Sequence, residues 1–364
     1  MKVTQIPFQK TGFFSKTMID YLEQKESIQP FYNNFPDIKG FKNQLEEKGN
    51  SFSKEHRKVL VAALNNQYKN IAVSEETQAN IDSLANTNAF TVTTGHQLNL
   101  FTGPLYFLYK IISVINLAEE LKANFPVNDF VPVYWMATED HDFDEINYFN
   151  FQNKKVQWNR EDGGAVGRFN TEGLQVVFEQ FSKQIGTTRN AEFLKNLFEE
   201  GYVKHNTLTA ATRYIANQLF SIYGLVIVDG DDKDLKQLFT PFVAKELTEQ
   251  VSYKEVSKTI TALEKNYKIQ VNPREINQFY LSENSRERII LENGIYKVNN
   301  TDLTFTKEEI LKHLDENPQN FSPNVIMRPL YQEVILPNLA YTGGGGELAY
   351  WLELKDYFNE VNIP

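Results

Sequence analysis

An α/β protein built around an open parallel β-sheet is the fold class that this sequence predicts. Short apolar runs alternate along the chain with segments of helical periodicity, which is the pattern of repeated strand–helix–strand units. One run, FVPVYWMA at residues 130–137, is apolar almost throughout, as expected for a strand buried on both faces. Polar or glycine-rich loops follow the runs, at the edge where open parallel sheets bind their ligands.

The composition allows a large core and excludes several classes of protein. The chain has 364 residues, 41% hydrophobic and 13% aromatic, and its net charge of −10 argues against a non-specific nucleic-acid binder. The absence of cysteine excludes disulfides, thiolate zinc sites and a cysteine nucleophile. The first residues lack the apolar run of a signal peptide, and no run approaches the roughly 20 residues of a membrane span. We therefore expect a soluble, cytoplasmic protein with neither nucleic acid nor a membrane as partner.

Changes of composition and periodicity divide the chain into six predicted segments. A mainly helical region packs on the core, and the core itself is interrupted twice, the second time by a small antiparallel sheet. The predicted segments are the helical region 1–85, the first part of the core 86–150, insertion one 151–206, the second part of the core 207–240, insertion two 241–323 and the third part of the core 324–364.

The first predicted strand, residues 90–94, runs into the loop TGHQLNLFTGP at residues 94–104. A long helix with regularly spaced apolar residues is expected from Pro104, since proline is tolerated in the first turn. A strand that ends in a glycine-containing loop and restarts as a helix directs backbone N–H groups at one point, a geometry that binds anions. Lys110, two turns into this helix, has the simpler interpretation of a cation on the helix face.

Acidic residues follow the next two predicted strands. The run at 130–137 leads into TEDHDFDE at residues 138–145, and the short strand 225–228 leads into DGDD at residues 229–232. A solvated acidic loop is the ordinary interpretation of such a cluster. Position argues against it here, because both loops would lie at the ligand-binding edge of the sheet.

The last predicted part of the core repeats the same design. A helix at residues 324–336 carries Arg328 and Glu333, and a short strand then meets four glycines before a helix that we expect to begin at Glu347. Glycine is costly in backbone entropy, so a tetraglycine between strand and helix suggests that a ligand approaches the backbone closely. A flexible linker is the alternative.

Together, the loops 94–104, 138–145, 229–232 and 342–347 predict a Rossmann-like sheet with one ligand crevice. Neither GxGxxG nor GxxxxGK[ST] is present, so a standard dinucleotide site or a P-loop is not supported. The candidate catalytic residues are His96, His141 and Asp142. The candidate substrate- or nucleotide-binding residues are Thr94, Gly95, Gln97, Thr102, Gly103, Glu139, Asp140, Asp229, Arg328, Gly343, Gly344, Gly345, Gly346 and Glu347.

Each candidate has an ordinary structural alternative. Either histidine could simply order its loop by hydrogen bonds, and His141 could instead be a general base or a metal ligand. Asp140, Asp142 or Asp229 could hold Mg²⁺ through one or two carboxylates, although an aspartate-rich loop is weak evidence for a metal. Arg328 could pair with a substrate carboxylate or with Glu333.

Three long segments resemble one known family. TTGHQLNLFTGPLYFLYKIISVINLA, VPVYWMATEDHDFDEIN and MRPLYQEVILPNLAYTGGGGELAYWLELK are similar, in the same order, to the cysteine-adding enzymes of bacillithiol synthesis, the cysteine ligases of that pathway. The resemblance implies a Rossmann core with two connecting insertions, similar in outline to class I aminoacyl-tRNA synthetases and nucleotidyltransferases. It also implies the last step of bacillithiol synthesis, in which the carboxyl group of cysteine is joined to the amino group of glucosaminyl malate.

The resemblance also suggests a site and an assembly. The loop 94–97 would correspond to the HIGH-type nucleotide-binding signature, with ATP or ADP and Mg²⁺ as candidate cofactors and the cysteine and sugar-malate molecules as partners. The family forms homodimers through a helical coiled-coil arm that follows the glycine-rich segment, and we expect this chain to lack that arm.

A mechanism follows as a hypothesis. Loops 94–104 and 342–347 would hold nucleotide phosphates, loop 138–145 the amino groups, and Arg328 a malate carboxylate. The alternatives are a Rossmann-like nucleotidyltransferase, a metal-dependent phosphate-ester hydrolase with its metal at 138–145, and a non-catalytic nucleotide-binding protein.

Overall fold

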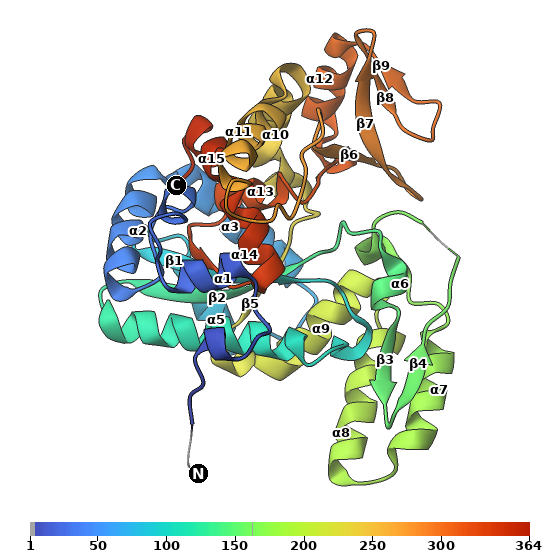
Figure 1. Ribbon diagram of the computed structural model, residues 1–364. Helices are drawn as coiled ribbons and strands as arrows, with labels where there is room; N and C mark the ends of the chain where they lie inside the picture. Colours follow the sequence, from blue (N-terminus) through green and yellow to red (C-terminus); the bar gives the residue numbers. More distant parts are fainter. Residues whose placement is uncertain (1–3, 162) are drawn as a thin grey trace.

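The core of the molecule is a four-stranded parallel sheet with the order β11-β1-β2-β5 (Figure 1). The computed structural model describes residues 4–161 and 163–364. The strands are β1 (Ala89–His96), β2 (Asp129–Met136), β5 (Val226–Asp229) and β11 (Asn338–Tyr341). The predicted α/β class and parallel sheet are confirmed.

The order of the strands reverses at β1. Two strands that follow in the chain, β2 and β5, lie on one side of β1, and the last strand, β11, lies on the other. Open α/β sheets bind ligands at such a switch point, outside the carboxyl ends of the strands. Because β1 is longer than predicted and pairs with β2 as far as His96 opposite Met136, its last residues are held rigidly at that edge.

Helix α5 (Tyr106–Asn124) connects β1 to β2 and packs along both strands. Its apolar face is buried and comprises Phe107, Ile111, Val114, Ile115, Ala118 and Leu121, whereas Ile112, which the helical spacing also placed on that face, is 41% exposed. Over the described residues, 4–161 and 163–364, no helix is both long enough and apolar enough to cross a membrane.

The N-terminal region contributes α1 (Lys16–Leu22), α2 (Ile38–Ser51), α3 (Lys54–Gln67) and α4 (Glu75–Ser83). Ser53 is the N-cap of α3, as predicted, since its Oγ accepts from the backbone N–H groups of Glu55 and His56 at 3.1 Å. The charged stretch that follows Asp37 forms α2, with Asp37 as its N-cap.

The polar face of α3 is solvated only in part, because Lys54, Glu55 and Lys58 are exposed whereas His56 and Arg57 contact other segments. Nδ1 of His56 lies 2.8 Å from the carbonyl oxygen of Val334. Arg57 is buried, and its Nη1 donates to the carbonyl oxygens of Leu84 and Ala89. Charged residues in a helical sequence do not reveal such contacts, because their partners come from other segments.

Insertion one stands apart from the sheet at the lower right of Figure 1. It contains the hairpin β3 (Tyr148–Phe151) and β4 (Lys154–Gln157) with α7 (Leu174–Ile185) and α8 (Arg189–Phe198), and it lies between α6 (Phe143–Ile146) and α9 (Leu208–Phe220). Phe101 of the β1 loop inserts its ring among Phe149, Phe181 and Phe198. Its backbone N–H also donates to the hydroxyl of Tyr202 at 2.7 Å, so the loop is fastened to the insertion.

Insertion two, at the top of Figure 1, carries a five-stranded antiparallel sheet of order β10-β6-β7-β8-β9. The small antiparallel sheet predicted for insertion two is present, and its strands lie between Gln278 and Pro323. Its elements are β6 (Gln278–Leu281), β7 (Arg286–Glu292), β8 (Ile295–Val298), β9 (Thr304–Phe305), β10 (Phe321–Pro323) and α12 (Lys307–Glu316), preceded by α10 (Lys233–Glu249) and α11 (Val251–Leu263).

The last part of the chain forms α13 (Arg328–Ile335), α14 (Gly345–Leu352) and α15 (Lys355–Glu360). α13 is shorter than the predicted 324–336, because the side chain of Asn324 accepts from the N–H of Ile326 and holds residues 324–327 in a turn. α14 begins two residues before Glu347. The carboxylate of Glu347 accepts from the N–H of Gly344 at 2.8 Å and so caps the first turn.

Candidate functional site

The four predicted loops all follow carboxyl ends of parallel strands, so they lie at one edge of the sheet. The loops after β1 and β11 are joined directly. Thr94 Oγ1 donates to the carbonyl oxygen of Thr342 at 2.7 Å, and the N–H of Gly95 donates to the hydroxyl of Tyr341 at 3.2 Å. Hydrogen bonds therefore close the β1–β11 junction, and the open space lies beside it.

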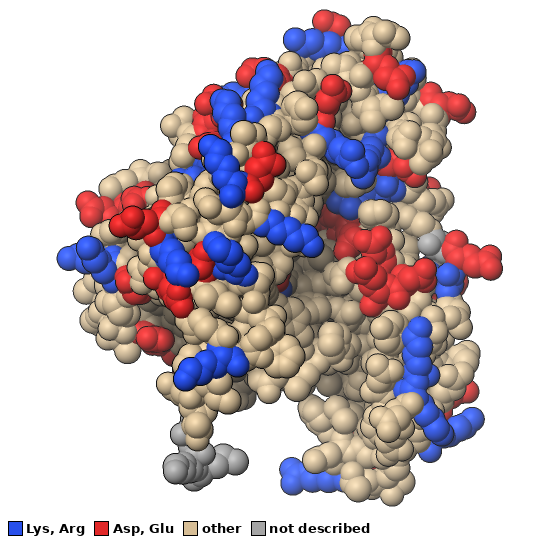
Figure 2. All heavy atoms as spheres, in the orientation of Figure 1, with Lys and Arg blue, Asp and Glu red and all other residues tan. Residues whose placement is uncertain are grey.

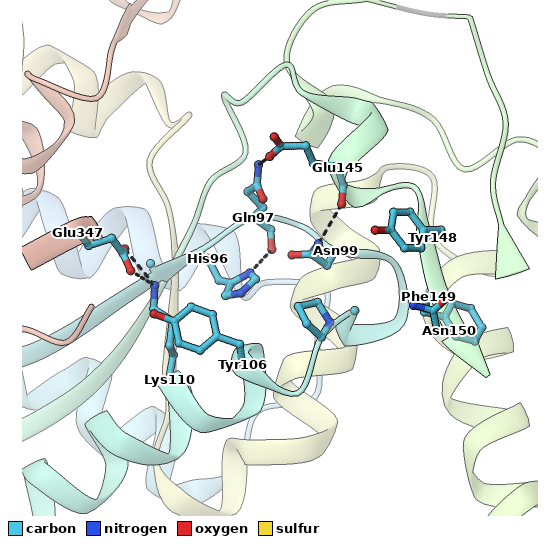
Figure 3. Close-up of a pocket in the computed structure, with 13 residues that line it drawn as sticks. His96, Gln97, Asn99, Tyr106, Lys110, Glu145, Tyr148, Phe149, Asn150 and Glu347 are labelled. Atoms are coloured by element: carbon cyan, nitrogen blue, oxygen red, sulfur yellow. Dashed lines mark hydrogen bonds and ion pairs between the residues drawn. The ribbon is translucent and has the colours of Figure 1, made fainter. Parts of the chain in front are cut away.

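That space is a cavity of about 610 Å³, which we call the β1 cavity (Figure 3). The end of β1, the loop after it, the start of α5, Glu145 of α6, strand β3 and Glu347 of α14 all contribute to its wall. Its volume is within the range of small-molecule sites. The lining residues are Gly95, His96, Gln97, Asn99, Gly103, Pro104, Tyr106, Lys110, Glu145, Tyr148, Phe149, Asn150 and Glu347.

His96 presents a neutral imidazole to the β1 cavity. Its Nδ1 lies 3.2 Å from the carbonyl oxygen of Gln97, which can only accept, so the proton is on Nδ1 and Nε2 keeps its lone pair. Burial lowers the pKa of His96, the Gln97 carbonyl raises it and the charge of Lys110 lowers it, with a net decrease. The rings of Tyr106 and Phe107 pack edge-on and hold the imidazole in place.

Lys110 is not merely a cation on the helix face, because it is 5% exposed and paired with Glu347. Its Nζ lies 3.0 and 2.8 Å from the two carboxylate oxygens. The hydroxyl of Tyr341 also donates to Glu347, at 2.5 Å. This carboxylate thus already satisfies the lysine and the N-terminus of α14, where the sequence predicted nucleotide phosphates.

Gln97 and Asn99 connect the β1 loop to the acidic loop. Gln97 Nε2 donates to Asp140 Oδ2 at 3.0 Å and to Glu145 Oε2 at 2.9 Å. Asn99 is 8% exposed, and its Nδ2 donates to the carbonyl oxygen of Glu145 at 3.4 Å. A side-chain hydrogen bond between the Asn99 amide and the imidazole acts to raise the pKa of His96, against the larger effect of burial.

Glu139 and Asp229 do not face the β1 cavity. They belong to an ion network, which we define as Glu139, Asp231, Lys236 and Arg168 with the adjoining Asp229; Glu139 and Lys236 are buried, and Arg168 lies at the exposed rim. Lys236 Nζ lies 2.7 Å from Glu139 Oε1 and 2.9 Å from Asp231 Oδ1, and Arg168 binds both oxygens of Asp231 at 2.6 and 2.8 Å. Asp229 accepts from the hydroxyl of Thr138.

The pKa values within the network differ because the partners differ. Burial raises the pKa of Glu139, even beside Lys236, and burial raises the pKa of Asp229. Burial also acts to raise the pKa of Asp231, but Lys236 and Arg168 outweigh it and lower that pKa. The carboxylates of Glu139 and Asp231 are thus paired with cations of the chain itself.

His141 lies outside the β1 cavity, beside insertion two. Its Nδ1 is 3.1 Å from Nη1 of Arg286, and because a guanidinium only donates, Nδ1 is the acceptor. Arg286 also donates to Ser322 Oγ and to the carbonyl oxygen of Pro323. Acidic side chains gather on the surface over α6 and the loop before it, beside cations of insertion two (Figure 2). The contacts of His141 are those of a histidine that orders its loop.

Asp140, His141 and Asp142 bring three candidate ligand atoms within 4.8 Å of one another. The set fits Mg²⁺ poorly. Asp140 Oδ1 accepts from the N–H of His141 at 2.7 Å and Oδ2 accepts from Gln97, while Arg286 adds a positive charge beside the histidine.

Arg328 is also outside the lining of the β1 cavity. Its Nη1 donates to Gln332 Oε1 at 3.1 Å, and its guanidinium lies 5.2 Å from the centre of the Tyr341 ring. The alternative pairing with Glu333 is wrong, because Glu333 binds Lys48 at 2.8 Å.

Close packing explains two of the four glycines at 343–346, Gly343 and Gly344, whereas a Cβ at Gly345 or Gly346 would meet nothing closer than 3.4 Å. A Cβ at Gly344 would overlap the hydroxyl of Tyr106, and one at Gly343 would lie 2.8 Å from Cβ of Glu347. Gly343, Gly344 and Gly345 line a second cavity of about 860 Å³ on the side of α1 and α2. Thr102, another predicted residue, has a φ of +68° and lies at the sharp turn before Gly103, outside the lining of the β1 cavity.

The structure thus brings Gly95, His96, Gln97, Gly103 and Glu347 together and separates them from His141, Asp142, Asp229 and Arg328. Eight lining residues were not among the predicted site residues. Asn99, Pro104 and Glu145 lie in loops that the sequence singled out, and Lys110 was interpreted as a cation on the helix face. Tyr106 of α5 carries no signal, and neither do Tyr148, Phe149 and Asn150, because β3 reaches the cavity only through the fold of the insertion.

Comparison with known proteins gives a consistent result. Residues 1–364 match the family model described as "Bacillithiol biosynthesis BshC, N-terminal Rossmann-like domain". A Flavobacterium johnsoniae protein named "Putative cysteine ligase BshC" is 58% identical over 358 residues, which cover 98% of this chain and 68% of that protein. A Cytophaga hutchinsonii protein of the same name is 45% identical over 361 residues, covering 99% of this chain and 67% of that protein.

Proposed function

This chain belongs to the BshC family of bacillithiol biosynthesis, and we propose that it is the ligase that joins the carboxyl group of cysteine to the amino group of glucosaminyl malate. The observation that carries the proposal is His96. A half-buried, neutral imidazole, with Nδ1 engaged by the carbonyl oxygen of Gln97, faces a cavity of about 610 Å³ at the switch point of the sheet. Amide formation needs a proton acceptor of this kind beside the attacking nitrogen.

The bond changes define what the site must do. The amine nitrogen attacks the activated carboxyl carbon of cysteine, a C–N bond forms, and the C–O bond to the leaving group breaks with its electron pair. The proton that the nitrogen loses passes to Nε2 of His96. Since hydroxide is a poor leaving group, we propose ATP as the activator of the cysteine carboxylate.

The residues around His96 serve this proton transfer. The carbonyl oxygen of Gln97 fixes the tautomer, and the rings of Tyr106 and Phe107 fix the plane of the imidazole. The neighbouring Lys110 disfavours the imidazolium and so keeps Nε2 free between turnovers, while Glu347 balances this charge once the proton has arrived.

The test is a mass-spectrometric assay with the whole protein, glucosaminyl malate, cysteine and ATP, and a parallel reaction without ATP. We expect a product of the mass of bacillithiol only in the complete reaction. Release of phosphate or nucleotide products without an amide would contradict the proposal and favour a hydrolase or nucleotidyltransferase. Formation of the amide without ATP would contradict the choice of activator alone.

A further inference from the structure

The loop after β1 contains three consecutive residues with positive φ angles. Phe101, Thr102 and Gly103, which we call the 101–103 turn, have φ angles of +48°, +68° and +52°. We infer that Tyr202 of insertion one is a positioning residue for His96, because its hydroxyl holds this turn and the turn supports the side chain that contacts the imidazole. The inference rests on the proposed function, in which His96 accepts the proton of the amine.

The 101–103 turn requires contacts from outside itself. A positive φ is uncommon for any residue other than glycine, and it is least favourable for a β-branched residue such as Thr102, because Cβ crowds the backbone. Such conformations cost free energy and persist where the surrounding structure holds them. The contacts that hold Phe101 and Thr102 are therefore part of what shapes the loop.

Insertion one supplies these contacts at Phe101. The N–H of Phe101 donates to the hydroxyl of Tyr202 at 2.7 Å, and Tyr202 is 1% exposed. The Phe101 ring packs against Phe149, Phe181 and Phe198, with ring centroids 5.4, 5.2 and 5.2 Å away. Loss of the Tyr202 hydroxyl would leave the half-buried N–H of Phe101 without this acceptor, whereas the ring contacts would remain.

The backbone around Tyr202 is also unusual. Tyr202 belongs to the π-helix η5 (Glu199–Val203), between α8 and α9. π-helices are rare, occur mostly as single turns and are frequently found at functional sites. A Cβ at Gly201 would lie 2.7 Å from Cγ1 of Ile215, so η5 is packed tightly against α9. The Tyr202 hydroxyl is thus held by a rigid support.

Asn99 connects the 101–103 turn to the imidazole. The backbone of Gly103 lies against the Asn99 side chain, since a Cβ at Gly103 would be 2.6 Å from Cβ of Asn99. The Asn99 amide hydrogen-bonds the imidazole of His96, which lies near it in Figure 3, and its Nδ2 donates to the carbonyl oxygen of Glu145. A displacement of the turn would therefore move the side chain that contacts the imidazole.

Tyr202→Phe tests the inference, because it removes the acceptor and keeps the ring. In the mass-spectrometric assay with the whole protein, we expect kcat to fall about tenfold, which corresponds to about 1.4 kcal/mol, with little change in KM. The pKa of His96, followed by NMR of the imidazole, should fall below its wild-type value, because the Asn99 hydrogen bond that raises it is weakened. A mere loss of folded protein would lower the amount of active enzyme without moving this pKa.

Two further variants separate positioning from packing. Phe178→Leu weakens the packing of the same insertion, where Phe178 stacks on Phe198, and should lower the melting temperature without changing the pKa of His96. Thr102→Gly removes the cost of the positive φ, so the turn depends less on Tyr202. In the double variant with Tyr202→Phe, kcat and the pKa should therefore return toward their wild-type values. An unchanged kcat and pKa in Tyr202→Phe, or a pKa change of equal size in Phe178→Leu, would overturn the inference.

The two proposals can fail separately. A pKa of His96 that moves in Tyr202→Phe, in a protein that forms no bacillithiol, would retain the link between Tyr202 and the imidazole and reject the ligase. Bacillithiol formation at an unchanged rate in Tyr202→Phe would retain the ligase and reject Tyr202 as a positioning residue.

Discussion

Both halves of the sheet edge carry carboxylates, yet they differ in what satisfies them. Beside β1, the half-buried His96 and the exposed Glu145 line a cavity that a ligand can enter. Beyond β2 and β5, the ion network closes on itself, because Lys236 and Arg168 reach into the carboxylates from α10 and from insertion one. A loop whose carboxylates are all paired with cations of the chain therefore has a structural role, whereas a loop whose polar groups face a cavity can bind a ligand.

The closed half also joins three parts of the chain. Arg168 and Lys236 both donate to the carbonyl oxygen of Gln319, in insertion two, at 3.2 Å. The network thus connects the β2 and β5 loops to both insertions. We expect substitutions in this half to change stability and substitutions in the β1 half to change activity.

The largest expected effect is on catalysis, at His96. His96→Ala should lower kcat about 10²–10⁴-fold, the usual contribution of a general base, with little change in the melting temperature. His141→Ala should lower kcat far less, because its Nδ1 serves Arg286. Product formation by mass spectrometry measures both, and equal losses in the two variants would contradict the division between the halves.

The ion network should respond in the opposite way. Lys236→Met leaves Glu139 and Asp231 buried without their shared cation and should destabilise the fold by about 3–5 kcal/mol in denaturant unfolding. Lys233→Met, an exposed change on the same helix, should alter stability by less than about 0.5 kcal/mol. A Lys236→Met protein of unchanged stability would show that the ion network does not stabilise the fold.

Much of this fold could be predicted from the sequence, because local patterns specify it. The apolar runs located the four strands, and parallel pairing then required their loops to share an edge. The helix boundaries at 324–336 and Glu347 were wrong where a side chain, Asn324 or Glu347, caps backbone outside the apolar pattern.

The site was harder to predict, for a physical reason. The acidic loop 138–145 had the strongest sequence signal, but charge density does not reveal whether cations arrive from elsewhere. Arg168, Lys236 and Arg286 do arrive, from distant segments. Tyr148 and Asn150 of the cavity wall gave no signal at all, because β3 reaches the cavity only through the fold of the insertion.

Alanine substitutions at two glycines of the same sheet edge should differ in their cost to stability, because one glycine contacts a buried side chain and the other contacts a half-exposed one. A Cβ at Gly230 would lie 2.5 Å from Cζ2 of Trp135, which is 3% exposed, so Gly230→Ala should cost about 1–3 kcal/mol of stability. Gly344→Ala would displace the half-exposed Tyr106 at the cavity wall and should cost less than about 1 kcal/mol. Urea unfolding compares the two, and a larger loss for Gly344→Ala would reverse the contrast.

The smallest expected effect is a displacement of the pH–rate profile. Since the neutral imidazole is the active form, kcat/KM should fall as the pH drops through the lowered pKa of His96. Lys110→Met removes a positive charge that lowers this pKa, so the pKa should rise and the acidic limb should move to higher pH. Lys122→Met, an exposed change on the same helix, should leave the limb in place. Titration of the substrate amine is common to all three proteins, so the difference between their profiles reports on His96, and a limb that moves to lower pH in Lys110→Met would exclude His96 as the proton acceptor.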